Sequence, residues 1–169
     1  MKRLFFALWP NNETRKKIDK INQSISSAGL KRVKCDNLHV TLVFLGNVDA
    51  ESETMIRQRM KKISAQPFTI QFEQLSFWRK PRILCLTTQQ YDQQLIILVD
   101  GLKRELEQCG MPMEVRSYKP HITLARKVAK PIAIDIQPIE WRAQSFCLVE
   151  SVSAPEGIHY QVLQRWNFK

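Results

Sequence analysis

The chain has 169 residues, of which 44% are hydrophobic, so it is long and apolar enough for one compact domain with a sizeable core. Its net charge of +10 favours an acidic partner, for which phosphate-rich RNA is the natural candidate. The four cysteines lack a Cys-x-x-Cys pair, and no apolar run is long enough for a signal peptide or a membrane span, which favours a reduced, cytoplasmic protein without membrane contact.

The first half of the chain is expected to contain three strands and two helices. Residues 4–9 predict a strand, and the turn at 10–12 caps a helix with one apolar face, formed by Ile18, Ile21, Ile25 and Ala28. A second strand spans 38–45, and Asp49 caps a second helix that buries Met55, Ile56, Met60 and Ile63. Residues 68–72 alternate as a third strand, and the alternation slips at 73–74, which predicts a β-bulge.

The second half repeats part of this order. Residues 83–87 predict a strand, and a helix ending at Gly110 turns five apolar residues inward, namely Leu95, Leu98, Val99, Leu102 and Leu106. Strands follow at 120–125, 146–150 and 160–166. The order strand, helix, strand thus occurs twice, which predicts an α+β fold with two sheet lobes related by a pseudo-twofold axis and facing each other across a central cleft.

Two of the three histidines share a four-residue frame, one in each half of the chain: His39-Val40-Thr41-Leu42 and His121-Ile122-Thr123-Leu124. Each frame lies in a predicted strand, where side chains two residues apart point to the same face. Each half therefore presents an imidazole beside a hydroxyl. A lone histidine on an apolar strand is usually structural, but a repeated frame is poorly explained by chance. The third histidine, His159, has no threonine at the matching position and is expected to be an exposed turn residue.

Paired imidazoles without a neighbouring carboxylate pair suit a reaction in which one proton is removed and another is delivered. The ordinary histidine pKa of about 6.5 leaves both protonation states accessible near neutrality. One neutral imidazole can activate a water while a protonated one donates to a departing oxygen. Because the threonine hydroxyls can donate to oxygens that carry negative charge, the expected target is an anion such as a phosphodiester.

The twin motifs and their flanking blocks resemble the 2H phosphoesterase superfamily, in particular its RNA 2′,3′-cyclic phosphodiesterase branch, also called 2′-5′ RNA ligases. The similarity runs almost from end to end, through residues 3–7, 37–46, 120–126 and 160–166. It implies a single bilobal domain over residues 1–169, with two antiparallel-type sheets, flanking helices and a central cleft. The implied activity is hydrolysis of RNA 2′,3′-cyclic phosphate ends to 2′-phosphates by a monomer that needs no metal or other cofactor, with His39 and His121 as the catalytic pair. Reverse 2′-5′ ligation is possible at the same site.

The resemblance also implies that Thr41, Thr123 and Arg126 hold the phosphate oxygens. Arg126 presents a difficulty, because in a regular strand a residue five positions after His121 points to the opposite face, unless the chain bulges or ends there. The near-symmetric motifs leave open which histidine is the acid, with His121 preferred as base and His39 as acid. The four tryptophans, with Phe5 and Phe6, could include a base-stacking platform, but aromatic residues on strands usually belong to the core, and none of them is assigned to the site.

Two other readings remain open. An RNA- or nucleotide-binding module could keep the same cleft without turnover, although intact histidines in both motifs argue against it. A metal site on the two histidines lacks further ligands, because no Asp, Glu or Cys occupies either motif. Other branches of the superfamily, which act on short oligonucleotides or on small cyclic nucleotides, also remain possible.

Overall fold

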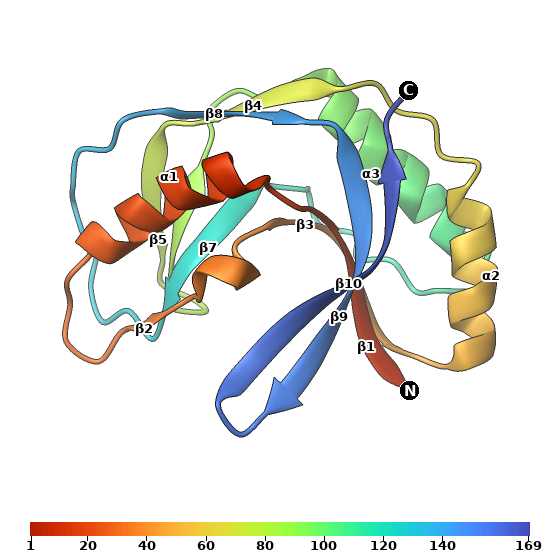
Figure 1. The fold of residues 1–169 in the computed structure, drawn as a ribbon, viewed down its shortest axis with the longest axis horizontal. Helices are drawn as coiled ribbons and strands as arrows, with labels where there is room; N and C mark the ends of the chain where they lie inside the picture. Colours follow the sequence, from red (N-terminus) through yellow and green to blue (C-terminus); the bar gives the residue numbers. More distant parts are fainter.

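The computed structural model describes residues 1–169 as an α+β fold (Figure 1). The helices are α1 (Asn12–Ser24), α2 (Ala50–Met60) and α3 (Gln93–Glu107), with a short 3-10 turn, η1 (Cys35–Asn37). The first five strands are β1 (Lys2–Leu8), β2 (Lys31–Arg32), β3 (Val40–Val48), β4 (Phe68–Phe72) and β5 (Gln74–Trp78). The others are β6 (Ile83–Thr87), β7 (His121–Arg126), β8 (Ile139–Ala143), β9 (Ser145–Ala154) and β10 (Gly157–Asn167). None of the helices is long and apolar enough to cross a membrane.

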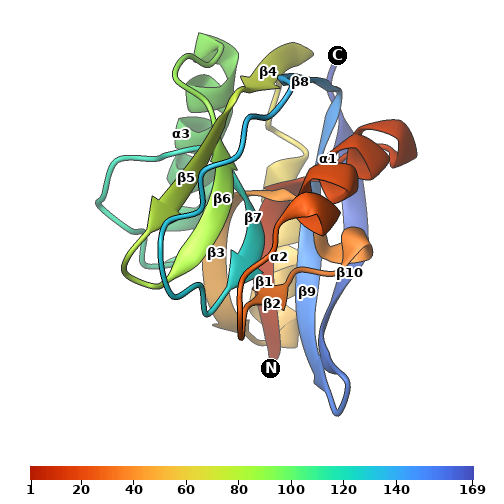
Figure 2. The same ribbon diagram turned by 90° about the vertical axis from the view of Figure 1, so that its left-hand side faces the viewer.

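There are two sheets, as expected, but they do not coincide with the two lobes. The larger has the order β10-β9-β1-β3-β7-β6-β5, with β2 paired to β7, and the smaller consists of β4 and β8. The predicted repeat is present as β1, α1 and β3 in the first half and as β6, α3 and β7 in the second. Strands β3 and β7 meet at a single registered antiparallel pair, Val40 and Ile122. The two lobes are therefore the two ends of one sheet, joined at the motif strands (Figures 1 and 2).

Most predicted inward-facing residues are buried, because their spacing matches the element they belong to. All five predicted residues of α3 are buried, and so are Ile18 and Ile25 of the first predicted helix. The N-caps form as expected, since the side chains of Asn11 and Asp49 accept main-chain N–H groups at the starts of α1 and α2. Figure 1 shows α1 on one side of the molecule and α2 and α3 on the other.

Three details differ from the sequence expectation. Met55 is 40% exposed, because α2 turns a narrower face to the core than the apolar spacing suggested, and Ala28 is exposed because α1 already ends at Ser24. Ile63 lies beyond α2 and packs against the core from the following turn. The predicted bulge at 73–74 is instead a break: β4 ends at Phe72 and pairs with β8, whereas β5 starts at Gln74 and pairs with β6. A change of sheet also interrupts the alternation of side chains.

The four cysteines are free. Burial raises the pKa of the Cys85 thiol to about 12 and that of Cys147 to about 11, so both thiols are protonated at neutral pH.

Candidate active site

The register between β3 and β7 brings the two motifs together. Val40 and Ile122 are paired, and both side chains are fully buried, so their neighbours in the motifs point to the opposite face of the sheet. In an antiparallel pair this places His39 opposite Thr123 and Thr41 opposite His121. Directly opposed Cβ atoms are about 4.5–5.5 Å apart and diagonal ones about 7–8 Å apart. The four side chains therefore form one cluster on one face, which we call the motif face.

Both motif strands contain a bulge at the same motif position. On β3 the pairing with β1 passes from Thr41 directly to Val43, which leaves Leu42 unpaired. On β7 the pairing with β6 passes from Thr123 directly to Ala125, which leaves Leu124 unpaired. Each extra residue reverses the alternation of side chains beyond it. The leucine that the two motifs share is thus the bulged residue in both.

These bulges resolve the difficulty with Arg126. Leu124 and Ala125 are both buried in succession, and Arg126 then stands exposed on the same face as His121 and Thr123. The equivalent residue in the first half is Phe44, which is 60% exposed on the motif face. Because β3 and β7 are antiparallel, Phe44 and Arg126 lie at opposite ends of the histidine pair. The pseudo-twofold site is therefore symmetric in its His-Thr pairs and asymmetric at its two ends.

His39 is held by main-chain and aromatic contacts. Its Nδ1 lies 2.6 Å from the carbonyl oxygen of Asn37 and its Nε2 lies 3.0 Å from Thr41 Oγ1. A carbonyl oxygen only accepts, so Nδ1 carries the proton and the neutral Nε2 accepts from the threonine hydroxyl. The ring stacks on Trp9 at 5.5 Å and meets the edge of Tyr160 at 5.0 Å between ring centroids.

His121 is fixed in a similar way but is more open. Its Nδ1 lies 2.8 Å from the carbonyl oxygen of Lys119, which again assigns the Nδ1 proton and leaves Nε2 with a free lone pair. Its ring packs against Trp78 at 4.5 Å between centroids. Both histidines therefore use a main-chain carbonyl two residues earlier to set the tautomer, and both direct the unprotonated nitrogen away from that carbonyl.

The surroundings favour the neutral form of both imidazoles. Burial lowers the pKa of His39 to about 4, with the nearby positive charges of His121 and Arg126 acting in the same direction. Burial also lowers the pKa of His121, and the charges of Arg116 and Arg126 lower it further. Arg126 thus acts electrostatically on both histidines. An anion bound between these groups would offset the positive charges and favour protonation of the imidazoles.

Several residues that contact the motifs were not identified from the sequence. Trp9, Trp78 and Phe5 contact the motif histidines and are not simply core residues as expected. Asn37 donates through its side chain to the Ile158 carbonyl at 2.8 Å and accepts from the Tyr160 N–H at 3.2 Å, which ties η1 to β10. The sequence signal for Asn37, Phe5 and Tyr160 was their position in the blocks 37–46, 3–7 and 160–166, which extend beyond the two four-residue frames.

His159, expected to be an exposed turn residue, lies in β10, but its side chain is exposed as expected, and its Nε2 lies 2.9 Å from Glu156 Oε1. It lies outside the motif cluster.

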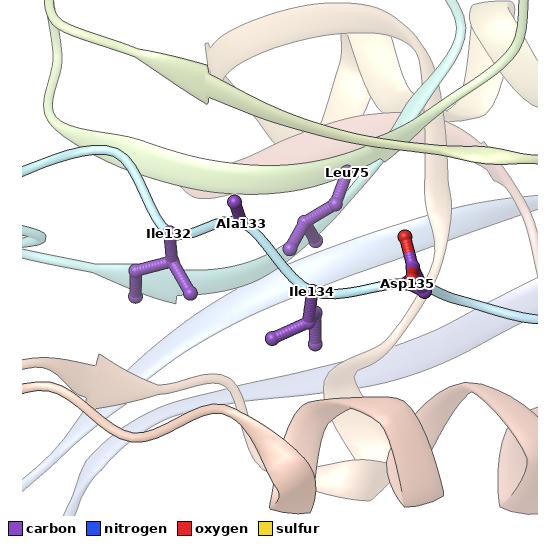
Figure 3. A pocket seen from close by; sticks show the side chains of 5 residues that line it. All are labelled: Leu75, Ile132, Ala133, Ile134 and Asp135. Carbon is purple, nitrogen blue, oxygen red and sulfur yellow. The ribbon is translucent and has the colours of Figure 1, made fainter.

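Two cavities of the molecule are not lined by the motif histidines. One, of about 360 Å³, lies against residues Leu75, Ile132, Ala133, Ile134 and Asp135 (Figure 3). The other, of about 270 Å³, includes Trp9 together with Arg142 and Arg165. No group of three or more His, Cys, Asp or Glu side chains is arranged to hold a metal ion.

Comparison with known proteins identifies the family. The family model of LigT-like phosphoesterases matches residues 8–85 and 86–160, so that each half contains one match. RNA 2′,3′-cyclic phosphodiesterase of Escherichia coli strain K12 is 32% identical, covering 97% of this chain and 95% of that protein. The enzyme of the same name from Archaeoglobus fulgidus is 29% identical, with 96% and 98% covered. The crystal structure of E. coli LigT complexed with 3′-AMP superposes with a TM-score of 0.91 at 29% identity, covering 99% and 98% of the two chains. The chain belongs to the LigT-like phosphoesterases of the 2H superfamily.

Proposed function

We propose that this protein hydrolyses 2′,3′-cyclic phosphate ends of RNA to 2′-phosphates, with His39 and His121 as the catalytic pair. The observation that carries the proposal is the cross-strand pairing of two His-Thr units with Arg126 at one end. The similarity to enzymes named RNA 2′,3′-cyclic phosphodiesterase, over nearly the full length of the chain, supports the same substrate.

In the proposed reaction His121 is the base. Its Nε2 lone pair is free and its ring is more open to solvent than that of His39, so it takes the proton of a water that attacks phosphorus. The new P–O bond forms in line with the bond from phosphorus to O3′, which breaks. His39 gives its Nε2 proton to O3′, and the product keeps the phosphate on O2′.

His39 acquires this proton with the substrate. In the free protein burial holds its pKa at about 4, so the ring is neutral at pH 7. A phosphodiester brings a negative charge next to the ring, which favours the imidazolium, and the Asn37 carbonyl already accepts the Nδ1 proton. The protonated acid is therefore coupled to an anionic ligand.

The remaining groups hold the phosphate and the nucleoside. The hydroxyls of Thr41 and Thr123 and the Arg126 guanidinium donate to nonbridging oxygens, where negative charge grows in the transition state. Phe44 offers an exposed aromatic surface at the opposite end of the pair, suited to the terminal base. All these groups come from one chain, which supports action as a monomer, and none requires a metal. The reverse reaction, attack by a 5′-hydroxyl on the cyclic phosphate, would use the same groups.

The test is hydrolysis of a short RNA with a 2′,3′-cyclic phosphate end in the presence of EDTA, resolving 2′- from 3′-phosphate products. The parent should form the 2′-phosphate, and His39→Ala and His121→Ala should lose this activity while remaining folded. A folded parent that binds the RNA without turnover would instead support a binding module. Activity that EDTA abolishes and added metal restores would overturn the metal-free mechanism.

A further inference from the structure

A strongly basic surface adjoins Arg126. Three segments far apart in the sequence, 29–34, 79–83 and 125–130, each contain three lysines or arginines and no acidic residue. Strand pairing brings them together, since Lys31 pairs with Arg126 across β2 and β7, and Ile83 pairs with Arg126 across β6 and β7. Main-chain contact continues past the strands, because the Val128 N–H donates to the Arg82 carbonyl at 3.1 Å. These segments meet at the lower left of Figure 1.

Two of these cations have structural roles. The Arg32 guanidinium donates to the carbonyls of Asn22 and Ile25, and Arg82 donates to the carbonyl of Val128. A third, Lys34, lies past the end of β2 and directly precedes η1. The six that remain are exposed, and we call them the basic end: Lys31, Arg79, Lys80, Arg126, Lys127 and Lys130.

The basic end differs from the group of ion pairs near α2. Near α2 three cations are paired with carboxylates, since Arg57 and Lys2 both pair with Glu53 and Arg59 pairs with Glu105. None of the six cations of the basic end forms a salt bridge. Concentrating like charges costs free energy through their mutual repulsion, and a polyanion would relieve that cost.

We propose that the basic end binds phosphates of the RNA chain that precede the terminal cyclic phosphate. The inference rests on the proposed function, because Arg126 belongs to both surfaces: it faces the cyclic phosphate on the motif face and borders the basic end. Single-stranded RNA carries one negative charge per nucleotide, so a chain leaving the site meets these cations in succession. The preferred substrate is therefore an RNA of several nucleotides, and a mononucleotide cyclic phosphate reaches only Arg126.

The expected signature is a salt dependence that only the longer substrate shows. For single strands the logarithm of the binding constant falls with a slope of about 0.7 per phosphate contacted, so three contacts predict a roughly 20-fold loss between 50 and 200 mM salt. Two substrates are compared: a hexanucleotide with a 2′,3′-cyclic phosphate end, and uridine 2′,3′-cyclic phosphate. Between 50 and 200 mM salt, we expect kcat/KM for the hexanucleotide to fall about 20-fold more than kcat/KM for the mononucleotide.

The variant Lys31→Gln/Lys80→Gln/Lys130→Gln should abolish most of this excess and lower the ratio of hexanucleotide to mononucleotide kcat/KM by about 10-fold or more at 50 mM salt. The matched control is Lys61→Gln/Lys62→Gln/Arg104→Gln, which removes the same charge from exposed positions near α2 and α3. Its ratio should equal that of the parent. Equal thermal midpoints of the two triple variants show that both remain folded.

The outcomes separate this inference from the proposed function. If the parent hydrolyses both substrates with the same kcat/KM and the same salt dependence, the basic end does not bind the chain. If the hexanucleotide is preferred but both triple variants lower the ratio equally, general charge is responsible and the assignment to the basic end is wrong. If a folded parent hydrolyses neither substrate, the proposed function itself fails.

Discussion

Replacing His39 with Asn should remove a large pH dependence from the stability of the protein. Burial among aromatic rings holds the pKa of His39 at about 4 in the folded chain, whereas an unfolded histidine titrates near 6.5. As pH falls below about 6.5 the unfolded chain binds the proton first. The stability that His39 contributes is therefore complete above about pH 7 and is lost progressively as pH falls toward 4.

The size of this loss follows from the two pKa values. A separation of about 2.5 pKa units at about 1.36 kcal/mol per unit sets a limit of about 3.4 kcal/mol well below pH 4. Between pH 7.5 and pH 4.5, where the folded chain has begun to bind the proton as well, the change is about 2.5 kcal/mol. Asn is chosen because its side-chain amide can still donate to the Asn37 carbonyl, which limits the loss of hydrogen bonding.

The assay is urea unfolding of the parent and of His39→Asn at half-unit steps between pH 7.5 and 4.5. Carboxylates and the other histidines titrate in both proteins, so the difference between the two unfolding free energies isolates His39. Relative to the His39→Asn variant, the unfolding free energy of the parent should decrease by about 2.5 kcal/mol as pH falls from 7.5 to 4.5. A flat difference would show that folding does not lower the pKa of His39, and the argument that the substrate is needed to supply its proton would then be wrong.

Three substitutions address the other parts of the site. Arg126→Ala should lower kcat/KM about 100-fold or more, and kcat/KM of Arg126→Lys should lie between those of this variant and the parent, because an ammonium group cannot make the bidentate contact of a guanidinium. Steady-state kinetics measure both, and a fully active Lys variant would rule out bidentate contact. Phe44→Ala should weaken transition-state binding of an RNA end by about 1–3 kcal/mol, whereas Phe44→Tyr should stay close to the parent, and equal kcat/KM for all three proteins would exclude base stacking. Asn37→Asp removes the donor to the Ile158 carbonyl and should lower the free energy of unfolding by about 1–3 kcal/mol at pH 7. Urea unfolding measures this change, and an unchanged value would show that the hydrogen bond between η1 and β10 does not stabilise the fold.

Local pattern was sufficient for most of the secondary structure. The five apolar residues of α3 are all buried, because a spacing of three and four residues places them on one helix face regardless of what packs there. The alternation at 68–72 gives β4 for the same kind of reason. Strand β8 has the same alternation of Ile139, Trp141 and Ala143 and was missed, because a short isolated run is a weak signal until its partner strand is known.

The repeated His-x-Thr frame was enough to select the two histidines and two threonines of the candidate site, because side chains two apart on a strand share a face in any fold. Only the tertiary structure decided how the two frames meet. The pairing of Val40 with Ile122 places each histidine opposite the other motif's threonine, and this register depends on packing between the halves. The bulges at Leu42 and Leu124 likewise depend on pairing with β1 and β6. Side-chain alternation within one strand predicts Arg126 on the wrong face, since a bulge is a mismatch between two strands and has no meaning for one strand alone.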